Sequence, residues 1–250
     1  NMKKFWYKFL VVILSVGILT PGWITDFISP TRALASTAVG PNGPTPASVT
    51  GWTNPQNSAF SDGVYTTGPS VGLTAKGFGF NIPAGATIDG VVVNVERFIT
   101  RSNNKRLIDN WASVLKDGVV VYNSAHNRAT GTDWKVSTLT LKEEENKIYG
   151  SSTDTWGLSL TPSDINDPDF GFLLQPFVWS VGTGTLTAYV DYIGMTVYYS
   201  MPDITPPVIA SHTDVTVEAT SAAGAIVNYT PPTATDNVDA PAPAVCTPAP

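Results

Sequence analysis

Three prolines within seven residues, in the segment MPDITPP at residues 201–207, constrain this chain more than any other stretch. Proline fixes φ and lacks the N–H that a helix or a central strand needs, and the residue before it is also held extended. Regular structure is therefore expected to stop here. The sequence predicts a proline-rich linker over residues 201–207, with a β-rich module before it and a second module over residues 203–250.

The composition favours strands over helices. Charged residues make up 14% of the chain, whereas an ordinary soluble domain carries about 25%. The chain also contains 21 glycines and 20 prolines, which are the residues that end strands and build turns. Few charges with many turn residues indicate short strands joined by turns, so an all-β fold is expected.

The N-terminal segment has the three parts of a secretory signal peptide. Lysines precede an apolar run over residues 9–19, and an A-x-A cleavage pattern stands at residues 33–35. A retained membrane anchor is the alternative, but a spanning helix needs about 20 apolar residues and this run is much shorter. We therefore expect a signal peptide over residues 1–35, a secreted or cell-surface protein, and no transmembrane segment in the mature chain.

The charge of the mature chain excludes two classes of partner. Removing residues 1–35 takes away four basic residues and one acid, so 10 basic and 19 acidic residues remain, a net charge of −9. Nucleic acids and anionic membranes both need clustered positive charge. The basic residues between 97 and 106 are interpreted as a solvated loop, namely Arg97, Arg101, Lys105 and Arg106. An extracellular protein or a glycan is the expected partner.

Alternating apolar residues predict the strands of the first module. Val91, Val93 and Val95 share one face of a strand over residues 88–99, and a strand over residues 186–199 has the same period. Further strands are expected over residues 73–82, 111–116, 119–123, 136–141 and 170–175. A charged loop is expected over residues 142–147, and a flexible lead-in over residues 36–49.

The remaining local signals concern turns. Asp117-Gly118 suits a two-residue hairpin turn, and Thr161 followed by Pro162 predicts a capped helical turn. About eight strands without a long helix predict a jelly-roll-like β-sandwich over residues 50–200. Since this module contains no cysteine, burial of its core alone must hold it together.

Four stretches of the first module resemble a sandwich module of large bacterial secreted and surface proteins. They are WTNP at residues 52–55, FNIPAGATIDGVVVNVER at 80–97, WGLSLTPSDIN at 156–166 and AYVDYIGMTVYY at 188–199. The resemblance implies a scaffold that binds a ligand and brings no enzymatic activity with it.

The second module resembles the first part of a HYR (hyalin repeat) domain. The matching stretches are DITPPVI at residues 203–209, DVTVEA at 214–219, VNYTPPTATDN at 227–237 and CTP at 246–248. The resemblance implies an incomplete immunoglobulin-like β-sandwich, a role in extracellular adhesion, and a larger multidomain protein of which this chain is an N-terminal fragment. It also implies a disulfide from Cys246 to a partner beyond the C-terminus. Independently, Val215 and Val217 alternate with polar residues as in a half-buried strand.

Two acidic stretches are candidates for calcium. Asp164, Asn166, Asp167 and Asp169 carry the oxygen ligands that Ca²⁺ takes. Their spacing departs from an EF-hand loop at Pro168 and has no closing glutamate, so caps and turns are the expected role. Asp236, Asn237 and Asp239 allow the same two readings. No cofactor other than possible Ca²⁺ is expected.

The sequence offers little catalytic chemistry. Two histidines and one cysteine cannot build a His- or Cys-rich metal site, and the motif HExxH is absent. A Ser-His-Asp arrangement would need His126, which stands in a predicted polar loop. We therefore expect a protein that is not an enzyme, with no catalytic residues.

Tryptophans suggest where a ligand would bind. Trp134 and Trp179 fall in predicted loops, where an exposed indole ring could stack on a sugar. The leading hypothesis is a non-enzymatic secreted or cell-surface scaffold and adhesion protein. The alternative is a carbohydrate-binding module of a larger secreted hydrolase.

Overall fold

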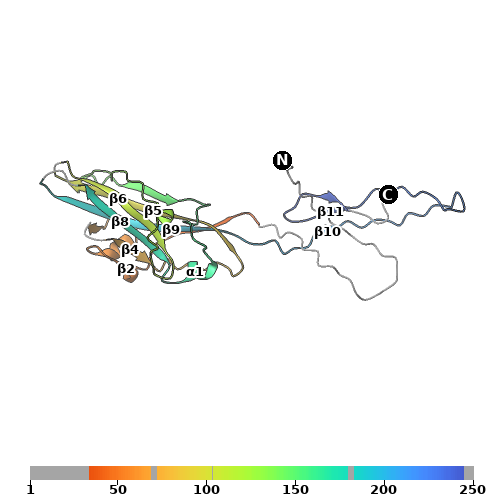
Figure 1. Cartoon of the computed structure of the whole chain (residues 1–250), viewed down its shortest axis with the longest axis horizontal. Coiled ribbons are helices and arrows are strands. Elements are labelled where there is room, and N and C mark those ends of the chain that lie inside the picture. Colours follow the sequence, from red (N-terminus) through yellow and green to blue (C-terminus); the bar gives the residue numbers. More distant parts are fainter. Residues whose placement is uncertain (1–33, 69–71, 103, 180–182, 245–250) are drawn as a thin grey trace. The chain divides into compact units, whose positions relative to one another are not determined.

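The computed structural model describes residues 34–68, 72–102, 104–179 and 183–244 (Figure 1). The packing divides the chain into two units: Ala35–Pro202 forms the first, and the second contains the segment from Asp203 onward. The boundary therefore falls inside the predicted linker. Residues 1–33 of the predicted signal peptide and Cys246 with its predicted disulfide lie outside the described residues.

A five-stranded antiparallel sheet forms one layer of the first unit. Its strands are β1 (Thr37–Asn42), β9 (Leu186–Ser200), β5 (Thr87–Arg101) and β7 (Glu145–Gly150) in that order, with β3 (Thr66–Gly68) also paired to β9. Strands β1 and β3 share one edge of β9, because Thr37 pairs with Tyr199 and Thr66 pairs with Val190. A single bridge between Ala59 and Tyr192 joins the edge between them.

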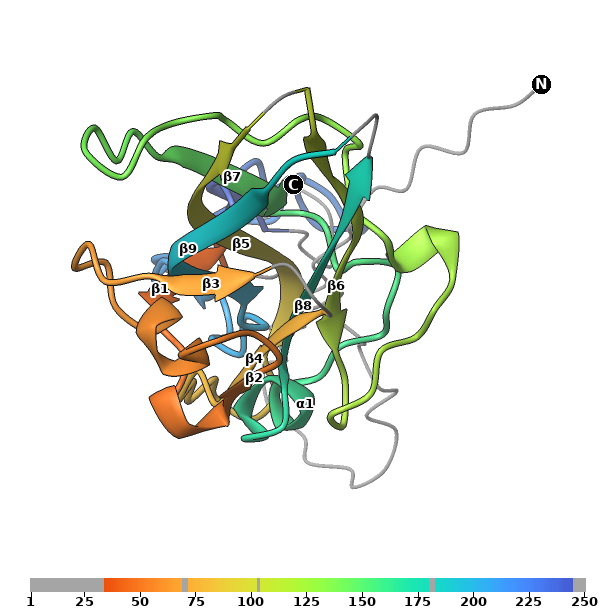
Figure 2. The same ribbon diagram turned by 90° about the vertical axis from the view of Figure 1, so that its left-hand side faces the viewer.

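A four-stranded antiparallel sheet forms the other layer. Its order is β2 (Val49–Thr50), β4 (Leu73–Lys76), β8 (Gly171–Trp179) and β6 (Arg106–Leu115). Strands β6 and β8 run side by side, and the C-terminal end of β8 points away from α1 (Pro162–Asn166) (Figure 2). The free edge of β6 is extended by an irregular segment, since Arg128 donates to the carbonyl of Ala112 and Trp134 to that of Leu107.

One apolar core joins the two sheets. Val91, Val93 and Val95 of β5 are fully buried, as the sequence predicts from their period. Strand β9 contributes Ile193, Met195 and Val197 to the same core. The opposite sheet contributes further buried residues, namely Leu73, Ala75, Ala112, Val114, Phe172 and Leu174. The first unit is therefore a two-sheet β-sandwich, and the prediction of an all-β fold is confirmed.

Two of the β-bulges in these sheets change the direction of side chains at the surface. The register between β5 and β9 shifts beside Glu96, so Asp191 is an extra residue on β9. The register between β6 and β8 shifts between Asp109 and Trp111, so Asn110 is an extra residue on β6. Such an insertion leaves two neighbouring residues opposite one on the partner strand. Both bulges lie beside the candidate sites described below.

Several predicted strand boundaries are wrong. The predicted flexible lead-in contains β1, because pairing with the edge of β9 satisfies its backbone despite the glycines and prolines. The strand predicted over residues 73–82 ends at Lys76, where Gly77 adopts a φ of +70°. The predicted hairpin turn at Asp117-Gly118 forms, but its return arm pairs only between Lys116 and Val119.

The order of strand and loop after residue 135 is reversed relative to the prediction. Residues 138–141 turn, with the N–H of Lys142 bonded to the carbonyl of Thr138, and Leu139 and Leu141 are exposed. The predicted charged loop instead contributes β7, which pairs with β5 over six residues from Glu145 to Gly150. Pairing to a long neighbouring strand outweighs the low strand propensity of Glu, Asn and Lys.

The helices of the described segments are short. Three 3-10 turns occupy η1 (Pro46–Ser48), η2 (Pro55–Ser58) and η3 (Ser124–His126). Helix α1 begins as predicted, with Pro162 in its first turn and a capping box between Thr161 and Asp164. No helix in the described part of the chain is long and apolar enough to cross a membrane.

The second unit has a small antiparallel sheet of β10 (Val208–Ile209), β11 (Thr233–Thr235) and β12 (Ala242–Pro243). Residues 211–219 contain no strand, so the strand predicted around Val215 and Val217 is wrong. Both valines are exposed, and the buried apolar residues among those described in this unit are Pro232, Ala234 and Ala244. Alternation alone does not form a strand where no apolar layer covers it.

Candidate functional sites of the sandwich

A charged cluster lies between the two sheets. Arg97 of β5 and Asp109 of β6 are fully buried, with Nη1 2.6 Å from Oδ1. Asp109 also accepts hydrogen bonds from Trp134 Nε1 at 2.7 Å and from the Tyr149 hydroxyl at 3.0 Å. The Arg97 guanidinium carbon lies 4.1 Å from the Trp134 ring centroid, and its Nε lies 2.8 Å from Glu145 Oε1. All these groups have internal partners, so the cluster connects the sheets.

The protonation state of Tyr149 suits this role. Burial raises the pKa of Tyr149 well above its ordinary value of 10.0, and the neighbouring Asp109 acts in the same direction. The phenol therefore stays neutral and can donate its proton to Asp109. A neutral donor stabilises the buried carboxylate without adding a charge to the core.

The interpretation of the basic segment as a solvated loop is wrong for Arg97. This residue continues the inward face of Val91, Val93 and Val95, so the period-two pattern already carried the signal. Arg101 and Arg106 are exposed as expected. Arg106 pairs with Asp133, and Arg101 donates to the carbonyl of Lys105.

The aspartates considered for calcium in the sequence hold turns instead. Asp164 caps α1 through Thr161 and pairs with Lys116 at 2.9 Å. Both ends of the Asn166 amide bond the backbone of Ile82. Asp167 accepts from the N–H of Asp169, and Asp169 itself pairs with Lys76. The structure does not gather these carboxylates around one point.

The corresponding residues of the second unit also form a turn. Asp236 accepts hydrogen bonds from the N–H groups of Val238 and Asp239. These bonds lower the pKa of the Asp236 carboxyl below its ordinary value.

A different set of carboxylates does converge, on the outer face of the five-stranded sheet. One carboxylate oxygen each from Glu96, Glu144 and Asp191 lies within 4.8 Å of the others. The bulge of β9 brings Asp191 beside Glu96, and the loop before β7 brings in Glu144. Oxygen ligands at this spacing suit a cation such as Ca²⁺. No sequence pattern indicates this set, because its members are far apart in the chain.

Internal donors already serve two of these carboxylates. The N–H of Gly63 lies 3.0 and 3.1 Å from the two oxygens of Asp191, and the hydroxyl of Tyr65 lies 2.5 Å from Glu144 Oε1. Burial raises the pKa of Asp191, and repulsion from Glu144 adds to this. The arrangement is stabilised by hydrogen bonds and opposed by the proximity of like charges.

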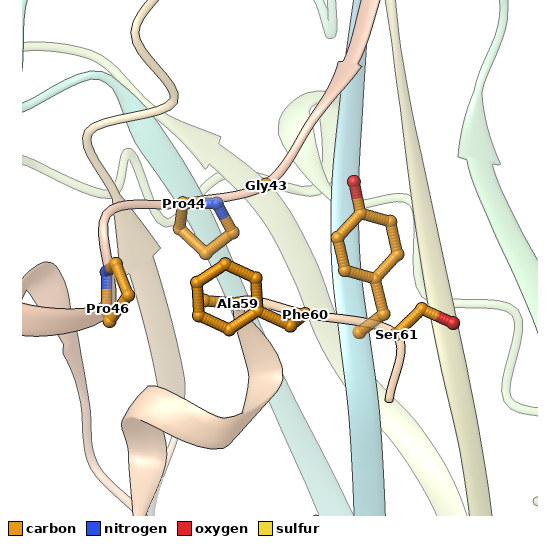
Figure 3. A pocket seen from close by; sticks show the side chains of 7 residues that line it. Gly43, Pro44, Pro46, Ala59, Phe60 and Ser61 are labelled. Atoms are coloured by element: carbon orange, nitrogen blue, oxygen red, sulfur yellow. The ribbon is translucent and has the colours of Figure 1, made fainter. Parts of the chain in front are cut away.

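A shallow pocket lies at the edge of β9 between β1 and β3, where Ala59 bridges Tyr192. Its volume is about 560 Å³, and its wall is formed by Gly43, Pro44, Pro46, Ala59, Phe60, Ser61 and Tyr192. The ring of Phe60 lies across the pocket from the rings of Pro44 and Pro46 (Figure 3). The wall is mainly apolar, and the Phe60 side chain is 57% exposed.

An aromatic strip covers the outer face of β6 and β8. We define it as Ile108, Trp111, Tyr122, Phe177 and Trp179. Phe177 and Trp179 are 50% and 53% exposed, and their ring centroids lie 6.3 Å apart. Ile108 pairs directly with Phe177, and Trp111 contacts Tyr122 with ring centroids 5.1 Å apart. The outer face of an antiparallel sheet is usually polar, so this strip is unusual.

The polar groups along the aromatic strip carry little net charge. Gln175 lies opposite Trp111 on the neighbouring strand. Arg106, which pairs with Trp179 in the sheet, forms an ion pair with Asp133, whose two oxygens both lie 2.8 Å from its Nε. The buried Nε1 of Trp111 has no hydrogen-bond partner among the described residues.

The two tryptophans selected from the sequence have different environments. Trp179 belongs to β8 and is exposed, so it remains available to a ligand. Trp134 is 1% exposed and donates to Asp109 in the core, so it cannot stack on a sugar. This corrects the predicted pairing of the two residues. Position in a predicted loop does not report burial, because a loop residue can point into the core.

His126 has a structural contact. Its Nδ1 lies 2.8 Å from the carbonyl oxygen of Trp156 at the end of η3. The ring therefore anchors the loop after β6 to the turn before α1.

These features define a class of protein, an all-β sandwich with a buried charged cluster, a shallow edge pocket and an exposed aromatic strip. No family model, curated protein or solved structure matches this chain.

Proposed function

We propose that this chain is a non-enzymatic secreted or cell-surface protein that acts as a scaffold and adhesion module. The observation that carries the proposal is the contrast between its interior and its surface. The buried ionisable groups Arg97, Asp109 and Asp191 are all engaged by internal partners, whereas Phe177 and Trp179 of the aromatic strip are half exposed. Such a molecule can hold a ligand on a rigid face without reacting with it.

The sequence adds two supports. The N-terminal segment has the pattern of an export signal, and residues 203–250 resemble the first part of a HYR domain, a module of extracellular adhesion. A sandwich without cysteine in residues 35–202 can operate outside the cell when its core is held by packing and ion pairs. The low positive charge of the mature chain favours a protein or a glycan over nucleic acid as the partner.

An adhesion experiment tests this function. Beads coated with the full chain should adhere to surfaces carrying extracellular matrix protein or polysaccharide. The amount of reducing sugar or peptide released from these surfaces should not increase with time. Bovine albumin on the same beads provides the background. Adhesion to neither kind of surface, or steady release of reducing sugar or peptide, would contradict the proposal.

Carbohydrate binding within a larger hydrolase is a second candidate, and a specific observation favours it. Trp179 and Phe177 stand exposed at successive outward positions of β8, the spacing at which aromatic side chains present a row of rings. In both candidate functions this chain binds its ligand without cleaving it. They differ in the chemistry of the ligand.

A further inference from the structure

We infer that the aromatic strip is a binding face for a neutral polysaccharide. The inference rests on the proposed binding function and deepens it by naming the face and the class of ligand. It depends on the chemistry of the strip, its size and its lack of net charge.

The chemistry of the strip suits a sugar. The faces of pyranose rings carry apolar C–H groups that pack on aromatic rings, while their hydroxyls need hydrogen-bond partners at the rim. Phe177, Trp179 and the Trp111–Tyr122 pair supply rings, and Gln175 supplies an amide between them. Tyrosine and tryptophan are suited to such surfaces because they combine an apolar ring with a polar end.

The size of the strip is too small for a stable protein interface. Two strands span about 10 Å across, and the five residues from Gln175 to Trp179 span about 13 Å along β8. A stable protein interface buries roughly 800 Å² on each partner, several times the area of this strip. A single extended oligosaccharide needs no more than a narrow row of rings.

The charge of the strip favours a neutral ligand. The cation nearest to Trp179 in the sheet is Arg106, and Asp133 neutralises it at 2.8 Å. The other members of the strip and Gln175 are uncharged. A face without net charge does not attract a polyanion by long-range electrostatics, and the net charge of −9 of the mature chain would repel one.

Affinity gel electrophoresis of the full chain tests the inference. The gels contain xylan, galactomannan or mixed-linkage β-glucan as neutral probes, and polygalacturonate as a charged probe. We expect at least one neutral probe to retard the protein. Trp179→Ala and Phe177→Ala should each weaken that binding about tenfold or more, as expected for central aromatic residues of a binding face. Both residues are exposed, so the variants should fold, which circular dichroism checks.

Phe60→Ala is the matched control, because Phe60 is equally exposed but lies at the pocket of the other sheet. Its retardation should equal that of the unchanged protein. Three results would overturn the inference: retardation by none of the neutral probes, retardation that survives Trp179→Ala and Phe177→Ala, or retardation that only Phe60→Ala abolishes. A dimer that Trp179→Ala dissociates, seen by sedimentation, would assign the strip to a second copy instead.

The two proposals fail in distinguishable ways. Adhesion of coated beads to matrix protein without retardation by any neutral polysaccharide would leave the scaffold function in place and remove the glycan. Release of sugar from the same probes would contradict the non-enzymatic function while leaving the binding face intact.

Discussion

Arg97 and Asp109 face each other across the interior of the sandwich, one from each sheet, with Nη1 2.6 Å from Oδ1 and both side chains fully buried. Many extracellular sandwiches join their sheets with a disulfide. This first unit has no cysteine, and the buried pair with Tyr149 and Trp134 forms a polar connection between the sheets instead.

Removing one member of the pair should destabilise the folded protein. Asp109→Ala should lower the free energy of unfolding by about 3–5 kcal/mol, because it leaves the Arg97 charge buried without its main partner. Urea denaturation followed by tryptophan fluorescence measures the change. The double variant Arg97→Met/Asp109→Leu removes both charges and should lose clearly less stability than Asp109→Ala. A loss in the double variant as large as that of Asp109→Ala would show that the unpaired charge of Arg97 is not what destabilises the single variant.

The raised pKa of Tyr149 predicts a loss of stability in alkali. The neutral phenol is favoured in the folded state, so its contribution is complete below the ordinary pKa of 10.0 and is lost as the pH rises above that value. The free energy of unfolding should therefore fall with pH above about pH 10. Tyr149→Phe should flatten this fall, and an identical pH dependence in both proteins would argue against a buried, neutral Tyr149.

The raised pKa of Asp191 predicts that its charge opposes folding. Since the folded state favours the protonated form, the penalty is present above the folded pKa and disappears below the ordinary value of 3.8. Asp191→Asn should raise the free energy of unfolding at neutral pH in the presence of a chelator, and the gain should vanish in acid. Asp133→Asn, which changes an exposed carboxylate paired with Arg106, should give no gain. A loss of stability for Asp191→Asn at neutral pH would contradict the expectation.

The N-cap of α1 should make a small contribution to the free energy of unfolding. Thr161 accepts the N–H of Asp164, so Thr161→Ala should lower the free energy of unfolding by about 1 kcal/mol. Thr153→Ala, at an exposed turn, should change it by less than about 0.5 kcal/mol. Chemical denaturation compares the two, and equal effects would mean that the cap is not stabilising.

Local sequence patterns were sufficient to predict those elements whose structure depends on a single segment of the chain. The strands β5 and β9 follow from alternating apolar residues, and α1 follows from Thr161 and Pro162. The turn at Asp117-Gly118 follows in the same way, because its two positive φ values suit these residue types.

Features that depend on pairing between strands far apart in the sequence could not be predicted from local patterns. Strand β7 forms because β5 offers a partner for residues 145–150, which their polar sequence does not indicate. The bulge residues Asp191 and Asn110 can be recognised only once the register of two strands is known. For the same reason the aromatic strip was not predicted, since Trp111 and Phe177 are brought together by pairing between β6 and β8.

Tryptophan indole N–H resonances test the glycan-binding face directly, because buried and exposed rings report separately. We expect the Trp179 and Trp111 signals in a ¹⁵N–¹H spectrum to shift on titration with xylohexaose, mannohexaose or cellohexaose. The signals of Trp134 and Trp156, which are buried and bonded to Asp109 and Val91, should stay in place. Shifts at the two strip tryptophans alone are the predicted result, whereas no shift with any of the three sugars, or shifts confined to other residues, would contradict a glycan-binding face on β6 and β8.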